Sequence, residues 1–148
     1  MDKINITFMT PSEWEVMRII WTKRSVSSLD VIEVMQRKRD WSESTIKTLL
    51  GRLTKKNILA TTKEGRHFNY RPTVPETAAM DETVTELFQH LCDMKKGAVI
   101  INLLAKLNLS KGDIERMQAQ LDKKLKDAPS TINCNCLYSG KNDCYMTD

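Results

Sequence analysis

The sequence predicts a mainly α-helical protein with one small β-hairpin. Three observations support this fold class: helix-start motifs recur along the 148 residues, apolar side chains follow helical spacing after them, and two short extended runs flank a glycine turn. A composition with 41% hydrophobic and 28% charged residues fits a folded domain. No apolar run approaches the roughly 20 residues of a membrane span, so we expect a cytoplasmic protein with no membrane partner.

Two helices are expected in the first forty residues. Thr10 precedes Pro11 and stands three residues before Glu13, which is typical of a capped helix start. The apolar residues that follow at helical spacing are Trp14, Met17, Ile20 and Trp21. Residues 27–30 start the second helix, whose expected apolar face consists of Leu29, Ile32 and Met35.

The third helix is expected to run from an N-cap at Ser42 to about Lys56, with Asn57 as its C-terminal cap. Its apolar stripe has the spacing i, i+3, i+4 and i+7 and consists of Ile46, Leu49, Leu50 and Leu53. The extended runs 58–62 and 67–71 follow, and Gly65 between them supplies a hairpin turn. Three helices followed by a hairpin is the order of a winged helix-turn-helix domain.

The prolines at positions 72 and 75 interrupt the chain after the hairpin, so we place a DNA-binding domain at residues 1–73. Residues 74–128 are expected to be helical, with a break at Gly97 and a last helix starting at 110–113. Their apolar residues exceed what about 50 residues bury alone, which favours a helical dimerisation domain in a homodimer. The alternative is packing against the chain's own N-terminal domain.

Opposite its apolar stripe, the third helix has a face suited to the major groove of double-stranded DNA. Hydroxyl groups and Arg reach base edges, whereas Lys neutralises phosphate. The expected DNA-binding residues are Ser44, Thr45, Lys47, Thr48, Arg52 and Lys55, with Lys63 and Arg66 at the hairpin tip. Residues 1–73 hold 14 Lys or Arg against 8 Asp or Glu, a net charge of +6, whereas the remainder carries −2. The alternative is an ordinary solvated helix surface.

Residues 129–148 form a polar tail that holds three of the four cysteines. Thiolates one residue apart can converge on one soft metal ion, and Met is a good ligand for Cu(I) but a poor one for Zn(II). The expected metal ligands are Cys134, Cys136, Cys144 and Met146. The alternative is a tail with incidental thiols. Cys92, on an expected helix, is interpreted as a small buried apolar residue.

Segments 9–21 (MTPSEWEVMRIIW) and 41–53 (WSESTIKTLLGRL) resemble the penicillinase-repressor family of winged-helix regulators, and the resemblance extends from about residue 5 to 128. Ala128-Pro129 followed by the Cys134-Asn135-Cys136 motif is similar to its copper-responsive, CopY-type branch. That branch has two Cys-x-Cys pairs with a short spacer. Here the spacer is longer, and Met146 stands in place of the last cysteine.

The resemblance implies a homodimeric repressor on a pseudo-palindromic operator. It implies Zn(II) in the tail of the DNA-bound form and Cu(I) as the effector that releases the protein, with a copper chaperone as a candidate metal donor. One rival is a β-lactam-resistance repressor inactivated by proteolysis, and another is a copper-buffering protein. No pairing of a nucleophile with a base suggests an enzyme.

Overall fold

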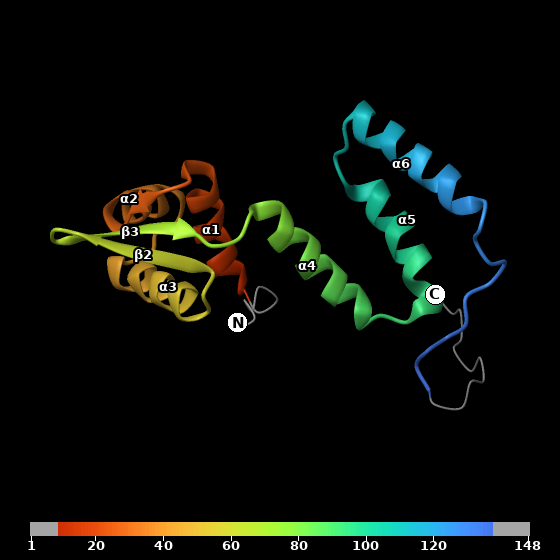
Figure 1. The fold of residues 1–148 in the computed structure, drawn as a ribbon, viewed down its shortest axis with the longest axis horizontal. Coiled ribbons are helices and arrows are strands. Elements are labelled where there is room, and N and C mark those ends of the chain that lie inside the picture. Colours follow the sequence, from red (N-terminus) through yellow and green to blue (C-terminus); the bar gives the residue numbers. More distant parts are fainter. Residues whose placement is uncertain (1–8, 138–148) are drawn as a thin grey trace. The chain divides into compact units, whose positions relative to one another are not determined.

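The computed structural model describes residues 9–137, which form two compact units, the first ending at Glu86 and the second beginning at Leu87. The fold is mainly α-helical with a small antiparallel sheet, as the sequence predicts. The first unit is a winged helix, in which three helices surround the sheet (Figure 1). Its elements up to the sheet are α1 (Pro11–Lys23), β1 (Val26–Ser27), α2 (Ser28–Lys38), α3 (Glu43–Lys55), β2 (Leu59–Glu64) and β3 (His67–Pro72). Most of the next helix also belongs to this unit.

The three helices begin where the sequence predicts, because each has a side-chain cap. The Glu13 amide donates to Thr10 Oγ1 at 3.2 Å, and the Glu13 carboxylate accepts from the Thr10 amide. Ser27 and Asp30 form the same reciprocal capping box at the start of α2. Ser42 Oγ accepts from the Thr45 amide at 3.2 Å, which satisfies one of the free N–H groups of α3.

The hydrophobic core of the first unit lies between the three helices and the sheet. The apolar stripe predicted for α3 is confirmed, since all four of its members are buried. The face predicted for α2 is wrong at one position: Leu29 is 55% exposed, whereas Val31 is fully buried. A spacing of three residues falls short of the 3.6-residue turn, so two such steps carry Leu29 away from the buried side.

The sheet has the strand order β1-β3-β2 and is antiparallel throughout. The predicted hairpin is confirmed and is longer than expected, with pairs from Leu59↔Pro72 to Glu64↔His67. Gly65 has φ +62°, the left-handed conformation that this tight turn requires. The sequence did not predict β1, since only its two residues pair with β3.

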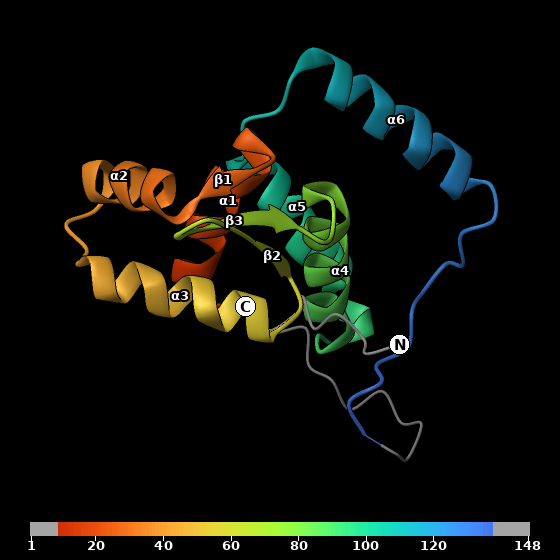
Figure 2. The same ribbon diagram turned by 60° about the vertical axis from the view of Figure 1, so that its left-hand side comes forward.

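After the sheet come α4 (Glu76–Gln89), the short 3₁₀ helix η2 (Asp93–Lys95), α5 (Lys96–Lys106) and α6 (Lys111–Leu125) (Figure 2). The break predicted at Gly97 is wrong. The helix α4 ends at Gln89, and Cys92 is extended, with φ −61° and ψ 124°. The break therefore precedes η2, and Gly97 lies in the first turn of α5. The capping box predicted at Ser110 and Asp113 is confirmed. Within residues 9–137, no helix is long and apolar enough to cross a membrane.

Candidate functional site

The exposed face of α3 carries most of the predicted DNA-binding residues. All eight of these predicted residues are exposed to solvent: Ser44, Thr45, Lys47, Thr48, Arg52, Lys55, Lys63 and Arg66. Four of them surround one shallow hollow of about 270 Å³, whose floor includes Leu49: Ser44, Thr45, Thr48 and Arg52. Lys63 lies on β2 and Arg66 in the turn of the hairpin. Three hydroxyl-bearing side chains and one guanidinium therefore line the hollow.

Hydroxyl groups at the start of α3 form hydrogen bonds with one another. Ser42 Oγ lies 2.8 Å from Thr45 Oγ1 and 3.1 Å from Ser44 Oγ. Thr48 Oγ1 donates to the Ser44 carbonyl at 2.8 Å. Because its proton is engaged there, Thr48 can offer its methyl group and an acceptor lone pair to a ligand, but no free donor.

The cations of this face differ in how they are engaged. Lys47 Nζ lies 2.6 Å from the Glu43 carboxylate, and both side chains are more than half exposed. Such a solvated pair is weak, so Lys47 can exchange Glu43 for a phosphate. Burial raises the pKa of Tyr70 on β3, and the charge of Lys47 opposes that rise. Within residues 9–137, the ion pairs do not include Arg52, Lys55 or the two hairpin cations.

A second candidate site is a cluster of three thiols in the second unit, formed by Cys92, Cys134 and Cys136 and called the thiol cluster below. Their Sγ atoms all lie within 4.8 Å of one another, and Cys92 Sγ lies 3.7 Å from Cys134 Sγ. The tail cysteines of the predicted set, Cys134 and Cys136, are therefore brought together. The other two predicted ligands, Cys144 and Met146, lie outside the described residues.

Sequence reasoning favoured a packing role for Cys92 over a role as a metal ligand. In the structure it is half-buried at the corner between α4 and α5, 42 residues from Cys134, and it faces the tail. No spacing rule joins residues so far apart, so the only available signal was that Cys92 is the remaining cysteine of a chain whose other three lie together.

Hydrogen bonds hold the tail against this corner. The Asp93 amide donates to Asn135 Oδ1 at 2.9 Å, which ties the middle residue of Cys134-Asn135-Cys136 to the residue after Cys92. The Cys136 amide donates to Cys134 Sγ at 3.4 Å, a contact that favours a thiolate. The Lys96 ammonium lies 2.5 Å from the Asp93 carboxylate, so the two charges at this corner balance each other.

The chemistry of the thiol cluster suits one soft cation. A Zn–S bond of about 2.3 Å places the sulfur atoms of a tetrahedral site about 3.8 Å apart, and a three-coordinate site needs only a slightly wider spacing. The 3.7 Å between Cys92 and Cys134 matches that edge. Three sulfur ligands favour Cu(I), whereas a closed structural zinc site needs a fourth ligand.

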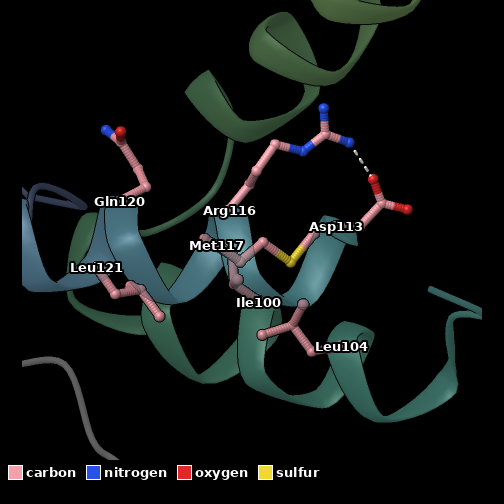
Figure 3. Close-up of a pocket in the computed structure, with 7 residues that line it drawn as sticks. All are labelled: Ile100, Leu104, Asp113, Arg116, Met117, Gln120 and Leu121. Atoms are coloured by element: carbon pink, nitrogen blue, oxygen red, sulfur yellow. Dashed lines mark hydrogen bonds and ion pairs between the residues drawn. The ribbon is translucent and has the colours of Figure 1, made fainter. Parts of the chain in front are cut away.

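The second unit also has an uncovered apolar groove between α5 and α6. The groove measures about 460 Å³, and apolar side chains of both helices point into it, as Figure 3 shows. Those side chains are Ile100, Leu104, Met117 and Leu121. An ion pair between Asp113 and Arg116 lies at its rim. Ile100 and Leu121 remain 46% and 59% exposed, so the described part of the chain leaves this surface open.

Comparison with known proteins gives consistent matches along most of the chain. Residues 9–123 match the family model described as penicillinase repressor. A 16.5 kDa protein of unknown character encoded in the ptsI 3′ region of Latilactobacillus sakei is 51% identical over 95% of each chain. The methicillin resistance regulatory protein MecI of Mammaliicoccus sciuri is 34% identical over 78% of this chain and 94% of its own. A solved structure of the CopR repressor is 46% identical over 40% of this chain and 86% of its own, with a TM-score of 0.37.

Proposed function

The chain belongs to the penicillinase repressor family, and on that premise we propose that it is a copper-responsive transcriptional repressor. In this proposal it binds a pseudo-palindromic operator as a homodimer in the cytoplasm, and Cu(I) binding to its thiols lowers operator affinity. The observation that carries the copper part is the convergence of three sulfur atoms within 4.8 Å, two of them from the tail.

The α3 face supports the DNA-binding part. Its hollow offers hydroxyl oxygens, the Thr48 methyl and the Arg52 guanidinium, groups that read base edges in the major groove. Lys47 and Lys55 on the same helix, with Lys63 and Arg66 at the hairpin tip, are placed in this proposal on the phosphate backbone. The start of α3 adds free backbone N–H groups, which favour a phosphate.

The uncovered groove of the second unit supports the homodimer. In the proposed dimer a second copy covers the apolar side chains of α5 and α6, and two α3 helices then meet the two half-sites of one operator. Joining two half-site contacts in one dimer can raise the overall affinity by about 10²–10⁴ over that of a single contact.

Cu(I) is a soft cation that thiolates bind strongly, and the tail supplies those thiolates. In this proposal Cys134, Cys136 and Cys144 hold the metal, with Met146 as a thioether ligand that suits Cu(I) better than Zn(II). The family resemblance adds Zn(II) as the ion of the DNA-bound form and a copper chaperone as donor. Metal analysis of protein purified with and without Cu(I) tests the resting metal.

A test starts from reduced, full-length protein and duplexes selected by it from a random-sequence library. Fluorescence anisotropy then measures the affinity for a selected duplex before and after addition of one equivalent of Cu(I) without oxygen. We expect a loss of affinity of about tenfold or more, the size of an ordinary allosteric coupling. Equal affinity with and without Cu(I) would contradict the copper part.

Serine variants supply the control. Replacement of Cys134, Cys136 and Cys144 by Ser should leave DNA affinity unchanged and abolish the response to Cu(I). Regulation in cells that survives these three changes favours the rival β-lactam-type repressor. Failure to select any sequence, together with tight Cu(I) uptake, favours the rival copper-buffering protein.

A further inference from the structure

We infer that Cys92 is a metal ligand, so that one soft ion is shared between the tail and the corner of α4 and α5. This inference rests on the proposed binding of Cu(I) by the tail. It adds a ligand from the helical unit to a set otherwise drawn from the last fifteen residues. The Cys92 and Cys134 sulfur atoms are 3.7 Å apart, and the Cys136 sulfur lies within 4.8 Å of both.

Cys92 lies in the three-residue connection between α4 and η2. It is the N-cap residue of η2, with η2 continuing directly into α5. Its side chain is half-buried, which restricts its rotamers and shields one side of the cluster from water. A thiol held in place before the metal arrives loses less conformational entropy on binding than one on a free tail.

The tail is brought to that thiol by contacts that do not involve the metal. Asn135 lies between the two tail cysteines, and its side-chain oxygen accepts the Asp93 amide hydrogen at 2.9 Å. Cys134 Sγ accepts the Cys136 amide hydrogen at 3.4 Å. Hydrogen bonds of this kind to ligating residues orient a site, and they stabilise the thiolate that a metal requires.

Cys92 also gives metal binding a direct route to the helices. If the tail alone held the ion, the metal site would lie on a polar segment and would have no ligand from the helices of the second unit. With Cys92 in the site, the ion restrains the residue that separates α4 from α5. Metal occupancy then acts on the same helical unit that is proposed to form the dimer.

Thiol footprinting on the unmodified protein tests the inference directly. Cys92, the Cys134/Cys136 pair and Cys144 fall on three different tryptic peptides, because Lys95, Lys126 and Lys141 separate them. Alkylation with iodoacetamide, followed by mass spectrometry, therefore reports each group. We expect one equivalent of Cu(I) to protect the Cys92 peptide together with the Cys134/Cys136 peptide. Protection of the tail peptide alone would overturn the inference.

A second measurement uses a variant whose remaining cysteines are those of the thiol cluster. Cys144→Ser with Met146→Leu sets the reference affinity for Cu(I), measured against a chromophoric Cu(I) chelator. Adding Cys92→Ser should weaken binding at least about tenfold, as even loss of an outer partner of a ligand can do. Cys92→Ala and circular dichroism control for folding. Equal affinity with and without Cys92 contradicts the proposed ligand.

The two hypotheses fail in different ways. If Cu(I) protects Cys92 but does not lower DNA affinity, the result supports Cys92 as a ligand and contradicts the proposed copper-responsive function. If Cu(I) lowers DNA affinity while Cys92 stays reactive, the result supports the proposed function and contradicts Cys92 as a ligand. In the Cys134→Ser, Cys136→Ser variant, Cys92 should react equally with and without Cu(I).

Discussion

Glu13 is the charged side chain that the structure buries most deeply within residues 9–137, at 1% exposure. Its carboxylate accepts from the Thr10 amide and lies 2.7 Å from Lys56 Nζ, just beyond the end of α3. One side chain therefore caps α1 and connects it to the helix that is proposed to read DNA. The sequence predicted the cap, because that contact spans three residues, but not the ion pair, because Lys56 lies 43 residues away.

Glu13→Gln should destabilise the first unit by about 1–3 kcal/mol, since it removes the negative charge from the ion pair with Lys56 while keeping the size of the side chain. All three tryptophans of the chain lie in this unit, so their fluorescence during urea unfolding reports its stability. Glu15→Gln is the matched control: it breaks the exposed ion pair with Arg39 on the same helix and should have a much smaller effect. Equal losses in the two variants would contradict this account.

Gly51 lies on the exposed face of α3, and a Cβ atom added there meets no other atom within 4 Å. Gly51→Ala should therefore raise the stability of the first unit by about 0.5–1 kcal/mol through helix propensity. DNA affinity should fall, because the added methyl group would keep the backbone of α3 away from the base edges in the major groove of DNA. Anisotropy with a selected duplex measures this loss.

Gly97 is the matched control for Gly51, since it is an exposed helical glycine with equally open surroundings in α5. Gly97→Ala should leave DNA affinity unchanged. If Gly51→Ala stabilises the protein and also leaves affinity unchanged, the exposed side of α3 does not meet DNA closely.

At the scale of the elements, the sequence predicts most where the cause is local. The caps at Thr10, Ser27, Ser42 and Ser110 lie within three residues of their partners, and all four predicted helix starts are confirmed. The strand β1 has two residues and exists because β3 lies beside it, so its own sequence holds no signal. Leu29 shows that an apolar residue on a short helix does not identify the buried face without its neighbours.

The candidate sites follow the same rule. The α3 face could be predicted because one helix carries it, and the hollow at Ser44 and Thr48 adds only detail. The place of Cys92 could not be predicted, because it depends on the path by which the chain returns after α6. The Asp93–Asn135 hydrogen bond, which spans 42 residues, fixes that path in the structure.

Acid should weaken the caps of α2 and α6. Hydrogen bonds from Ser27 lower the pKa of Asp30, and those from Ser110 and Arg116 lower the pKa of Asp113, both from an ordinary value of 3.8. A lowered folded-state pKa adds stability that is full above the ordinary value and is lost as the pH falls through the folded-state value. We expect a flat unfolding midpoint above about pH 5 and a decline below pH 4. Asp30→Asn with Asp113→Asn should flatten that decline, and an unaltered decline would assign it to other carboxyl groups.

At the scale of the whole molecule, the two units differ in how completely they bury their apolar side chains. The first buries a continuous core, whereas apolar residues of α5 and α6 line an open groove. Such a surface in one copy matches itself in a second copy related by two-fold symmetry, which is the simplest way to cover it. The proposed homodimer follows from this difference.

Leu121→Asp should convert the proposed dimer into a monomer, since it introduces a charge into the groove without disturbing the core of the first unit. Affinity for a duplex with two half-sites should fall by about 10²–10⁴, whereas affinity for a single half-site should not change. Ala119→Asp, on the opposite side of α6, is the matched control. Sedimentation equilibrium gives the mass, and a Leu121→Asp protein of unchanged mass would exclude this groove as the dimer surface.

The short distance between Cys92 and Cys134 has a thermodynamic consequence as well. An ion held by both sulfur atoms closes a ring between residues that are 42 positions apart, and this ring includes α5 and α6. In the chain-entropy model, a crosslink that closes a ring of this size lowers the conformational entropy of the unfolded chain, which stabilises the folded state by about 3–4 kcal/mol. One equivalent of Cu(I) should therefore raise the melting temperature of the helical unit, and Cys92→Ser should abolish that rise even where the tail still binds the metal. The cell's copper level would then determine how long the helical half resists unfolding and proteolysis.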